Sequence, residues 1–203
     1  MAASGAVKSP APFSPATLPS PRLLKFLFTD TRMSWLWLLV RIWVGWQWLS
    51  AGWEKLHNPA WVGGRAGTAL HGFLLGALKQ TTGAHPNVQP WYAHFLNGVA
   101  LPGVHVFTYL VAFGETAVGV ALILGVLTGA AAFFGCFMNL NYLLAGAVST
   151  NPVLGVLGLL LMLGWRTAGW LGADRWILPV IGTPWHPGTA FAEHRVRHVP
   201  LHS

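Results

Sequence analysis

Long apolar stretches, each about 20 residues, dominate the hydropathy pattern of this chain. They span residues 34–53, 103–125, 127–148 and 152–171. A helix of about 20 residues, rising ~1.5 Å per residue, crosses the ~30 Å hydrocarbon core of a bilayer. The pattern therefore predicts four transmembrane helices.

The connections between the later stretches are short. Gly125–Gly129 joins the second to the third, and Ser149–Pro152 joins the third to the fourth. Helices joined by a few residues pack as antiparallel neighbours. We therefore expect an all-α fold, a four-transmembrane-helix antiparallel bundle, with the membrane domain covering residues 34–180.

The loop at residues 54–102 carries helical patterns of its own. Apolar residues recur at helical spacing within Gly64–Gln80, and Trp91, Tyr92 and Phe95 indicate a second, shorter helix. We expect amphipathic helices on the membrane surface here. The alternative is a plain solvated loop.

The two ends of the chain lack long apolar runs. Residues 1–33 are rich in Ala, Pro and Ser. Because Pro and Ser disfavour helix interiors, this stretch predicts a mostly disordered tail with an interfacial piece near Leu23–Phe28. Residues 181–203 are expected to form a C-terminal tail.

Composition and charge support a membrane assignment. Charged residues make up 8 % of the chain and hydrophobic residues 54 %, against about 25 % charged in soluble domains. The net charge of +7 does not point to nucleic acid, because the basic residues flank apolar runs. The N-terminal tail and the segment after the fourth helix hold Lys8, Arg22, Lys25, Arg32, Arg166, Arg175, Arg195 and Arg197, whereas the long loop holds Lys55, Arg65 and Lys79.

This asymmetry predicts the orientation, because cytoplasmic segments of membrane proteins are enriched in Lys and Arg. Both termini are expected in the cytoplasm, with the long loop outside a bacterial-type inner membrane. Cys136 is the single cysteine, so haem attachment through paired cysteines, an Fe–S cluster and a zinc ribbon lack their ligands. The histidines show no metal-site spacing, and we expect no metal.

Two charges fall inside the predicted hydrocarbon region, where an unpaired charge costs several kcal/mol. Arg41 lies ~10 Å deep in the first helix and Glu115 ~15 Å deep in the second. Their similar depth predicts that they face each other, directly or through a polar bridge. The pair could fix the helix register or form a catalytic site for protons or a ligand.

Aromatic and amide side chains accompany these charges. Trp48 shares the Arg41 face of the first helix, while Asn139 and Tyr142 share a stripe of the third. Amides and hydroxyls commonly tie membrane helices together by hydrogen bonds. The alternative is that these three residues hold a cofactor, with Asn139 and Tyr142 bonding a quinone carbonyl.

Polar residues also gather at the outer ends of the helices. Lys55 and His57 follow the first helix, and Asn151 precedes the fourth. They are expected at the same surface, where they would attract a substrate anion. Ordinary capping and interfacial anchoring is the other interpretation.

Several short motifs, taken in order, resemble the DoxX family of four-helix membrane proteins. They are Ala51–Leu56 with Gly45, Gly114-Glu115 with Gly119, Met138–Tyr142 with Ala145-Gly146, Ser149–Pro152, and Gly172–Trp176. The resemblance spans residues 34–180. The family includes the large subunit of thiosulfate:quinone oxidoreductase, so the resemblance implies a membrane, quinone-linked redox context.

Two functions remain open. The chain could be a subunit of a quinone-dependent oxidoreductase that oxidises a sulfur anion such as thiosulfate and reduces the quinone pool. It could instead be a non-catalytic subunit of a larger respiratory or photosynthetic complex, contacting other membrane subunits or itself, since long Ala/Pro/Ser-rich tails can order on a partner.

Overall fold

The computed structural model describes residues 21–183 and 186–192. The described chain is mainly helical, with one two-residue ladder between β1 (Gly182–Thr183) and β2 (His186–Pro187). The helices of the bundle are α2 (Ser34–Leu56), α5 (Val104–Leu124), α6 (Thr128–Leu144) and α7 (Asn151–Leu163). Shorter helices are α1 (Arg22–Thr29), α3 (Thr68–Leu78), α4 (Pro90–Phe95), α8 (Trp165–Trp170), α9 (Asp174–Ile181) and α10 (Thr189–Ala192), with single turns at Thr31–Met33, Lys79–Thr81 and Leu96–Ala100.

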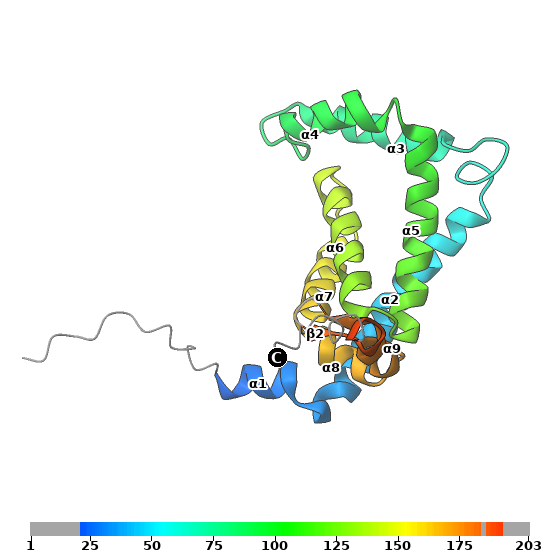
Figure 1. The fold of residues 1–203 in the computed structure, drawn as a ribbon. Helices are drawn as coiled ribbons and strands as arrows, with labels where there is room; N and C mark the ends of the chain where they lie inside the picture. The colour runs from blue at the N-terminus through cyan, green and yellow to red at the C-terminus, as the bar shows by residue number, and fades with distance from the viewer. Residues whose placement is uncertain (1–20, 184–185, 193–203) are drawn as a thin grey trace, which may run out of the picture.

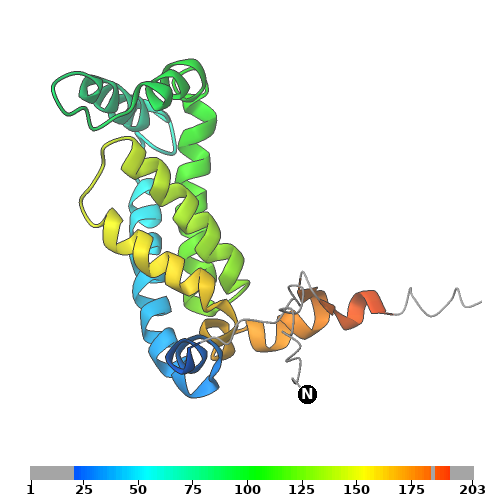
Figure 2. The same cartoon turned by 90° about the vertical axis from the view of Figure 1, so that its left-hand side faces the viewer.

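The bundle helices run between two distinct ends (Figure 1). Helices α3 and α4 lie across one end, which we call the loop end, while α1, α8 and α9 lie at the other, the terminal end. In the perpendicular view, α9 extends sideways from the bundle (Figure 2). The helical fold and the presence of helices within the long loop thus agree with the sequence pattern.

Close contact between α2 and α5 depends on glycine. A Cβ added to Gly52 would collide with the backbone of Thr116, and one added to Gly119 would collide with the backbone of Leu49. The two helices therefore approach backbone to backbone, as small residues allow in membrane bundles. This crossing holds the two longest helices together.

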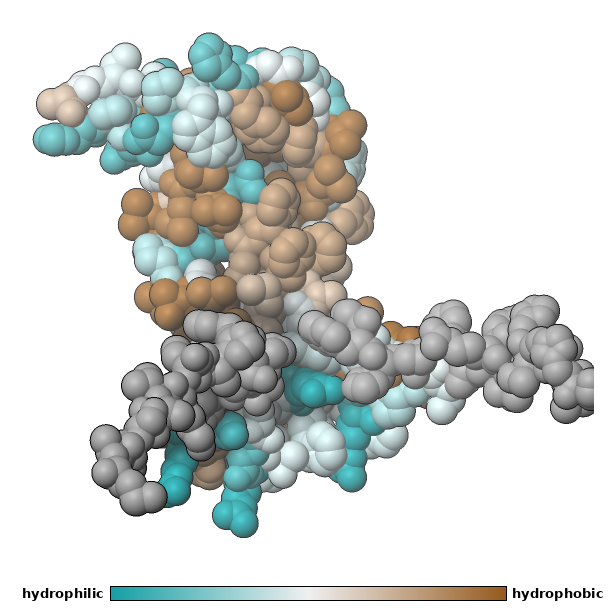
Figure 3. Space-filling view, turned by 60° about the vertical axis from the view of Figure 1, so that its left-hand side comes forward, coloured by the Kyte–Doolittle hydropathy of each residue, from teal (hydrophilic) through white to brown (hydrophobic). Residues whose placement is uncertain are grey.

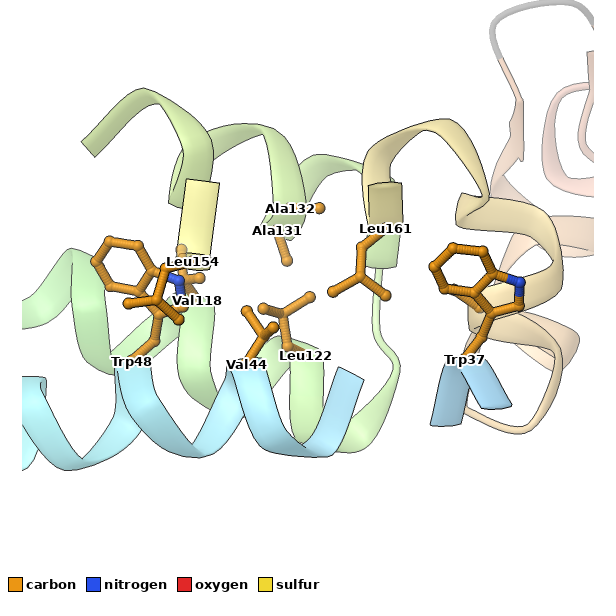
Figure 4. Packing of buried hydrophobic residues seen from close by; sticks show 10 residues of the cluster. Trp37, Val44, Trp48, Val118, Leu122, Ala131, Ala132, Leu154 and Leu161 are labelled. Atoms are coloured by element: carbon orange, nitrogen blue, oxygen red, sulfur yellow. The ribbon is translucent and has the colours of Figure 1, made fainter. Parts of the chain in front are cut away.

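The main core fills the space between α2, α5, α6 and α7. Val44 and Trp48 of α2 meet Leu122 of α5 and Leu161 of α7, and the small residues Ala131 and Ala132 let α6 come near (Figure 4). A second cluster at the loop end packs Leu70 and Leu74 of α3 against other buried side chains, including Val88, Tyr92, Leu96, Ala100 and Ala145. The long loop is therefore a folded cap with its own core.

The fourth apolar stretch differs from its prediction. A single helix over residues 152–171 was expected, but α7 ends at Leu163 and α8 begins at Trp165. Gly164 separates them at a point packed against Phe28 and Trp37, where a side chain would crowd both rings. Within residues 1–33, α1 occupies the expected interfacial piece, and residues 1–20 lie outside the described chain.

By length and apolarity together, α5 is the one helix among the described residues that qualifies on its own as a membrane span, and α7 is apolar but shorter. Helix α2 is long but carries Arg41, Glu54 and Lys55 among its residues. The outer surface nevertheless shows a mainly apolar middle between more polar ends (Figure 3).

Substituting Gly119 by Ala should destabilise the bundle, because the new methyl group would push α2 away from α5. Overpacking of this kind typically costs ~1–3 kcal/mol. Thermal unfolding in detergent would measure the loss. Gly76→Ala on α3 is the matched control, since nothing lies within 4 Å of its added Cβ, and it should be neutral or stabilising by up to ~1 kcal/mol. Equal effects of the two changes would contradict this account of the crossing.

Candidate functional site

A buried carboxylate lies at the centre of the candidate site. Glu115, in the middle of α5, is 2 % exposed. The Tyr142 hydroxyl of α6 donates a hydrogen bond of 2.6 Å to its Oε1. Lys55 Nζ of α2 lies 2.7 Å from its Oε2. Three helices thus contribute one polar group each to a compact cluster.

Lys55 reaches this cluster because its side chain runs back along α2. Side chains on a helix lean towards its N-terminus, and here the ammonium group comes 3.5 Å from the carbonyl of Ala51. The ammonium also lies 5.1 Å from the ring centre of Trp61. Because the Lys55 side chain remains 20 % exposed, it connects the buried carboxylate with the loop end.

The contact between Lys55 and Glu115 is an ion pair at 2.7 Å. Besides this ammonium group, Oε2 of Glu115 has no hydrogen-bond partner among the described residues. A carboxylate oxygen accepts more than one hydrogen bond. The cluster therefore retains an open acceptor beside a cation.

An apolar cavity of about 210 Å³ adjoins this cluster. It lies between α5 and α6 and beneath the loop-end helices. Its polar side chains are Tyr142, Asn141 and Tyr92. The apolar lining is Leu70, Phe73, Leu74, Phe95, Leu96, Ala100, Phe107, Leu110, Val111, Phe137, Met138 and Ala145. Tyr142 thus faces the cavity and also bonds Glu115.

Asn141 and Tyr92 form a second polar pair on the cavity wall. The Tyr92 hydroxyl donates towards Asn141 Oδ1 and the Asn141 carbonyl, each at 3.1 Å. Asn141 Nδ2 donates to the Phe137 carbonyl at 2.7 Å, which uses one of its two N–H groups. Burial raises the pKa of Tyr92 to about 12, so this hydroxyl stays protonated at neutral pH.

Arg41 does not face Glu115, and that part of the prediction is wrong. Its guanidinium donates to the carbonyls of Ala168 and Leu171, at 3.0 and 2.9 Å. It packs against Gly125, ten residues beyond Glu115 on α5 and therefore ~15 Å further along that helix. The long Arg41 side chain extends towards the N-terminus of α2, so it reaches the terminal end instead of the middle of the bundle.

At the terminal end, Arg41 belongs to a separate polar cluster with Asp174. The buried Asp174 carboxylate accepts hydrogen bonds from the backbone N–H groups of Leu127 and Thr128, at 2.5 and 2.9 Å. It thereby caps the first turn of α6 from a residue 46 positions away, a role that a neighbouring Asp or Ser usually plays. Leu127 has a left-handed backbone conformation at φ 48°, which this bond helps to hold.

The other predicted cofactor and anion residues have separate surroundings. Asn139 is buried and donates to Asn151 Oδ1 at 3.2 Å, and Asn151 in turn donates to the Ala147 carbonyl. Trp48 is buried in the main core, with its ring 6.3 Å from that of Tyr142. His57 is exposed and packs on Trp53 at 4.2 Å. Neither Asn139 nor Trp48 belongs to the cavity lining.

The sequence interpretation missed Tyr92 and Asn141 as cavity residues. Asn141 lies two positions from Asn139, so it lies on a different face of the helix. Tyr92 was expected on a surface helix, and only the folding of the loop over α6 brings the two together. Across residues 21–183 and 186–192, no three His, Cys, Asp or Glu side chains are grouped as metal ligands would be.

An apolar outer surface and a buried charged cluster are typical of helical membrane proteins. The chain belongs to the DoxX family, a family of membrane proteins, because the sequence profile of that family matches residues 36–147. The resemblance noted in the sequence is thus confirmed. Searches of curated proteins and of solved structures found no match.

Replacing Lys55 with Met should destabilise the protein, because it leaves the Glu115 carboxylate buried without its cation. Removing one partner of a buried ion pair costs ~3–5 kcal/mol, and the partial exposure of Lys55 places the expected loss near the lower limit. Denaturation in mixed detergent would measure it, with the exposed Lys79→Met as the control. Adding Glu115→Gln to Lys55→Met should recover part of the loss, and strictly additive losses would argue against the pair.

Proposed function

We propose that the chain spans a bacterial-type inner membrane with four helical segments, α2, α5, α6 and α7 extended by α8. Both termini would lie in the cytoplasm and the loop end outside. Support comes from apolar side chains that point outward from every bundle helix, such as Leu39, Leu110, Phe137 and Val156. These faces suit lipid contact, since bundle surfaces this apolar are rarely exposed to water. The clustering of basic residues at the terminal end favours this orientation.

We further propose that the chain works in quinone-linked redox metabolism, as a subunit of a quinone-dependent oxidoreductase. The observation that carries this proposal is the apolar cavity beside the Glu115–Tyr142–Lys55 cluster. Cavities that enclose a whole drug-sized ligand span ~300–1,000 Å³. At about 210 Å³, this one suits a single planar ring whose apolar tail leaves towards the membrane.

The residues present also match the chemistry of a quinone head group. A bound quinone would accept two electrons and two protons. The second N–H of Asn141 is a donor on the cavity wall, and the Tyr142 hydroxyl becomes one when a protonated Glu115 donates to it. In this proposal Asn141 and Tyr142 orient the ring. Trp48 packs near Tyr142 and Asn139 bonds Asn151, instead of contacting the ligand as the sequence suggested.

Glu115 would supply protons to the cavity through Tyr142. Their 2.6 Å hydrogen bond lets Tyr142 release its own proton into the cavity while it takes one from a protonated Glu115. Lys55, which contacts Glu115 and is partly exposed, would return a proton to the Glu115 carboxylate from the loop end. Arg41 has no part in this route, since it lies with Asp174.

The electron donor proposed is a small sulfur anion of the thiosulfate class. Two thiosulfate ions that join through a new S–S bond form tetrathionate and release two electrons, which one quinone takes up. The two protons that the quinone also needs do not come from thiosulfate, so they would come from solvent at the loop end through Lys55, Glu115 and Tyr142. Lys55, His57 and Asn151 remain the proposed anion contacts at the loop end. Glu115 already neutralises Lys55, so an anion would share that cation.

One observation favours the second candidate, a non-catalytic subunit of a larger membrane complex. Trp46 is 61 % exposed and lies midway along α2, whereas Trp in membrane proteins concentrates at the two interfaces. With Trp35, Leu39 and Trp53 it forms an outward aromatic face. A neighbouring membrane subunit that covered this face would explain it.

An assay of thiosulfate-dependent reduction of a soluble quinone analogue, on protein in lipid nanodiscs, would test the first candidate. Glu115→Gln and Tyr142→Phe should each lower the rate by about a hundredfold, the usual contribution of a positioned acid or base. The matched controls are Glu54→Gln and Tyr109→Phe, which change exposed residues and should keep full activity.

Quinone binding provides a second readout. Val111→Trp, which enlarges a half-buried side chain of the cavity wall, should abolish binding of the analogue, while Glu115→Gln should keep it. If the quinone analogue binds but thiosulfate does not reduce it, the proposal that a sulfur anion is the electron donor is wrong. Absence of both would overturn the redox proposal and favour the structural subunit.

A further inference from the structure

A basic and aromatic pocket lies at the terminal end, remote from the Glu115 cluster. Arg166 lies 5.6 Å from the ring centre of Trp165, and Arg175 lies 5.2 Å from that of Trp170. All four residues line a cavity of about 310 Å³ between α8 and α9. Both arginines are exposed, so their guanidinium groups can reach a ligand at the membrane surface.

This pocket continues into an apolar groove. A neighbouring cavity of about 450 Å³ shares Trp165, Asp174 and Leu178 with it, and extends along α6 to Phe133 and across to Met162 of α7. The cationic part therefore lies at the terminal end, and the apolar part leads towards the middle of the bundle. A phospholipid has the same order of parts, with a charged phosphate followed by an acyl chain.

A buried hydroxyl without a partner points to a polar ligand at the junction. Thr128 lines the groove and is 0 % exposed, yet among the described residues its Oγ1 has no hydrogen-bond partner. Thr183 is a half-buried residue on the wall of both cavities, and its buried Oγ1 also has no partner among the described residues. Buried polar atoms are nearly always satisfied, so these two call for a donor or acceptor from a bound molecule.

The local charge favours an anion. Asp174 is the one carboxylate on these walls, and its oxygens already bond the N–H groups of Leu127 and Thr128. The two positive charges of Arg166 and Arg175 outweigh the single negative charge of Asp174, and Arg41 lies near that carboxylate. The N-terminus of α6, at Thr128 and Gly129, adds the positive end of a 17-residue helix.

We propose that this site binds one anionic phospholipid. Its phosphate lies between Arg166 and Arg175, its ester oxygens meet the hydroxyls of Thr128 and Thr183, and one acyl chain follows the groove towards Phe133. Basic pockets between membrane helices bind anionic headgroups in this way. The exposed Trp176 and Ile181 place α9 against the same leaflet, and its sideways course suits a helix lying on the membrane (Figure 2). This proposal is independent of the quinone site.

Native mass spectrometry of the delipidated full chain, titrated with dioleoylphosphatidylglycerol, tests the proposal. One lipid should bind more tightly than any later one, and dioleoylphosphatidylcholine should bind at least about tenfold more weakly, because it carries no net charge. Inorganic phosphate, which lacks the acyl chain, should not compete at millimolar concentration. Equal binding of both lipids, or competition by phosphate alone, would overturn the phospholipid assignment.

Variants separate a built site from general surface charge. Arg166→Gln/Arg175→Gln should weaken the first phosphatidylglycerol about tenfold or more. Arg22→Gln/Arg32→Gln removes the same charge at the same end but outside the pocket, and should leave that binding unchanged. Ala130→Trp, at an exposed position on the groove wall, should displace the acyl chain and also lose the lipid.

Unchanged helicity and melting temperature would show that the variants fold. Equal weakening by the two arginine pairs would mean that the lipid responds to net charge alone, which would overturn the site. Full lipid binding by a folded Ala130→Trp variant would overturn the proposal that the acyl chain lies in the groove.

Discussion

Pairing of a carboxylate inside an apolar bundle constrains this structure more than any other interaction. An isolated charge in that environment costs several kcal/mol, so Glu115 needs a cation and hydrogen-bond donors within reach. Lys55 and Tyr142 meet that need, and in doing so they link α2, α5 and α6 at a single point. The glycine crossing of α2 and α5 makes the link possible, because it brings the end of α2 close enough for a lysine side chain to reach.

The second polar cluster organises the opposite end. Arg41 binds the last carbonyls of α8, and Asp174 caps the first turn of α6, so residues far apart in sequence hold the turns between helices. The bundle thus has the Glu115 cluster towards the loop end and the Arg41–Asp174 cluster at the terminal end.

The cap over the cavity is a folded part of the loop between α2 and α5. Helices α3 and α4 bury Leu70, Leu74 and Tyr92 in a small core of their own, and that core forms one wall of the cavity. The cavity is therefore built jointly by a bundle and a folded loop. Quinone-linked chemistry follows as a proposal from the neighbourhood of an apolar ring-sized space and a buried acid, and membership of the DoxX family gives the membrane setting.

The sequence by itself determined the helices, because their signals are local. Apolar length predicted the bundle helices, and helical spacing predicted the cap. The cost of burying a charge singled out Arg41 and Glu115, and helical spacing placed Tyr142 on a polar stripe. Each of these depends on neighbours within a few turns of one helix.

Only the tertiary structure decided the partners. Depth alone predicted a contact between Arg41 and Glu115. The rotation of each helix and the direction of each side chain instead pair Glu115 with Lys55, and let Arg41 bond a carbonyl of α8. The break at Gly164 and the meeting of Tyr92 with Asn141 likewise depend on contacts between segments far apart in sequence. A polar side chain's depth follows from its position in a helix, whereas its partner depends on how the helices pack and turn against one another.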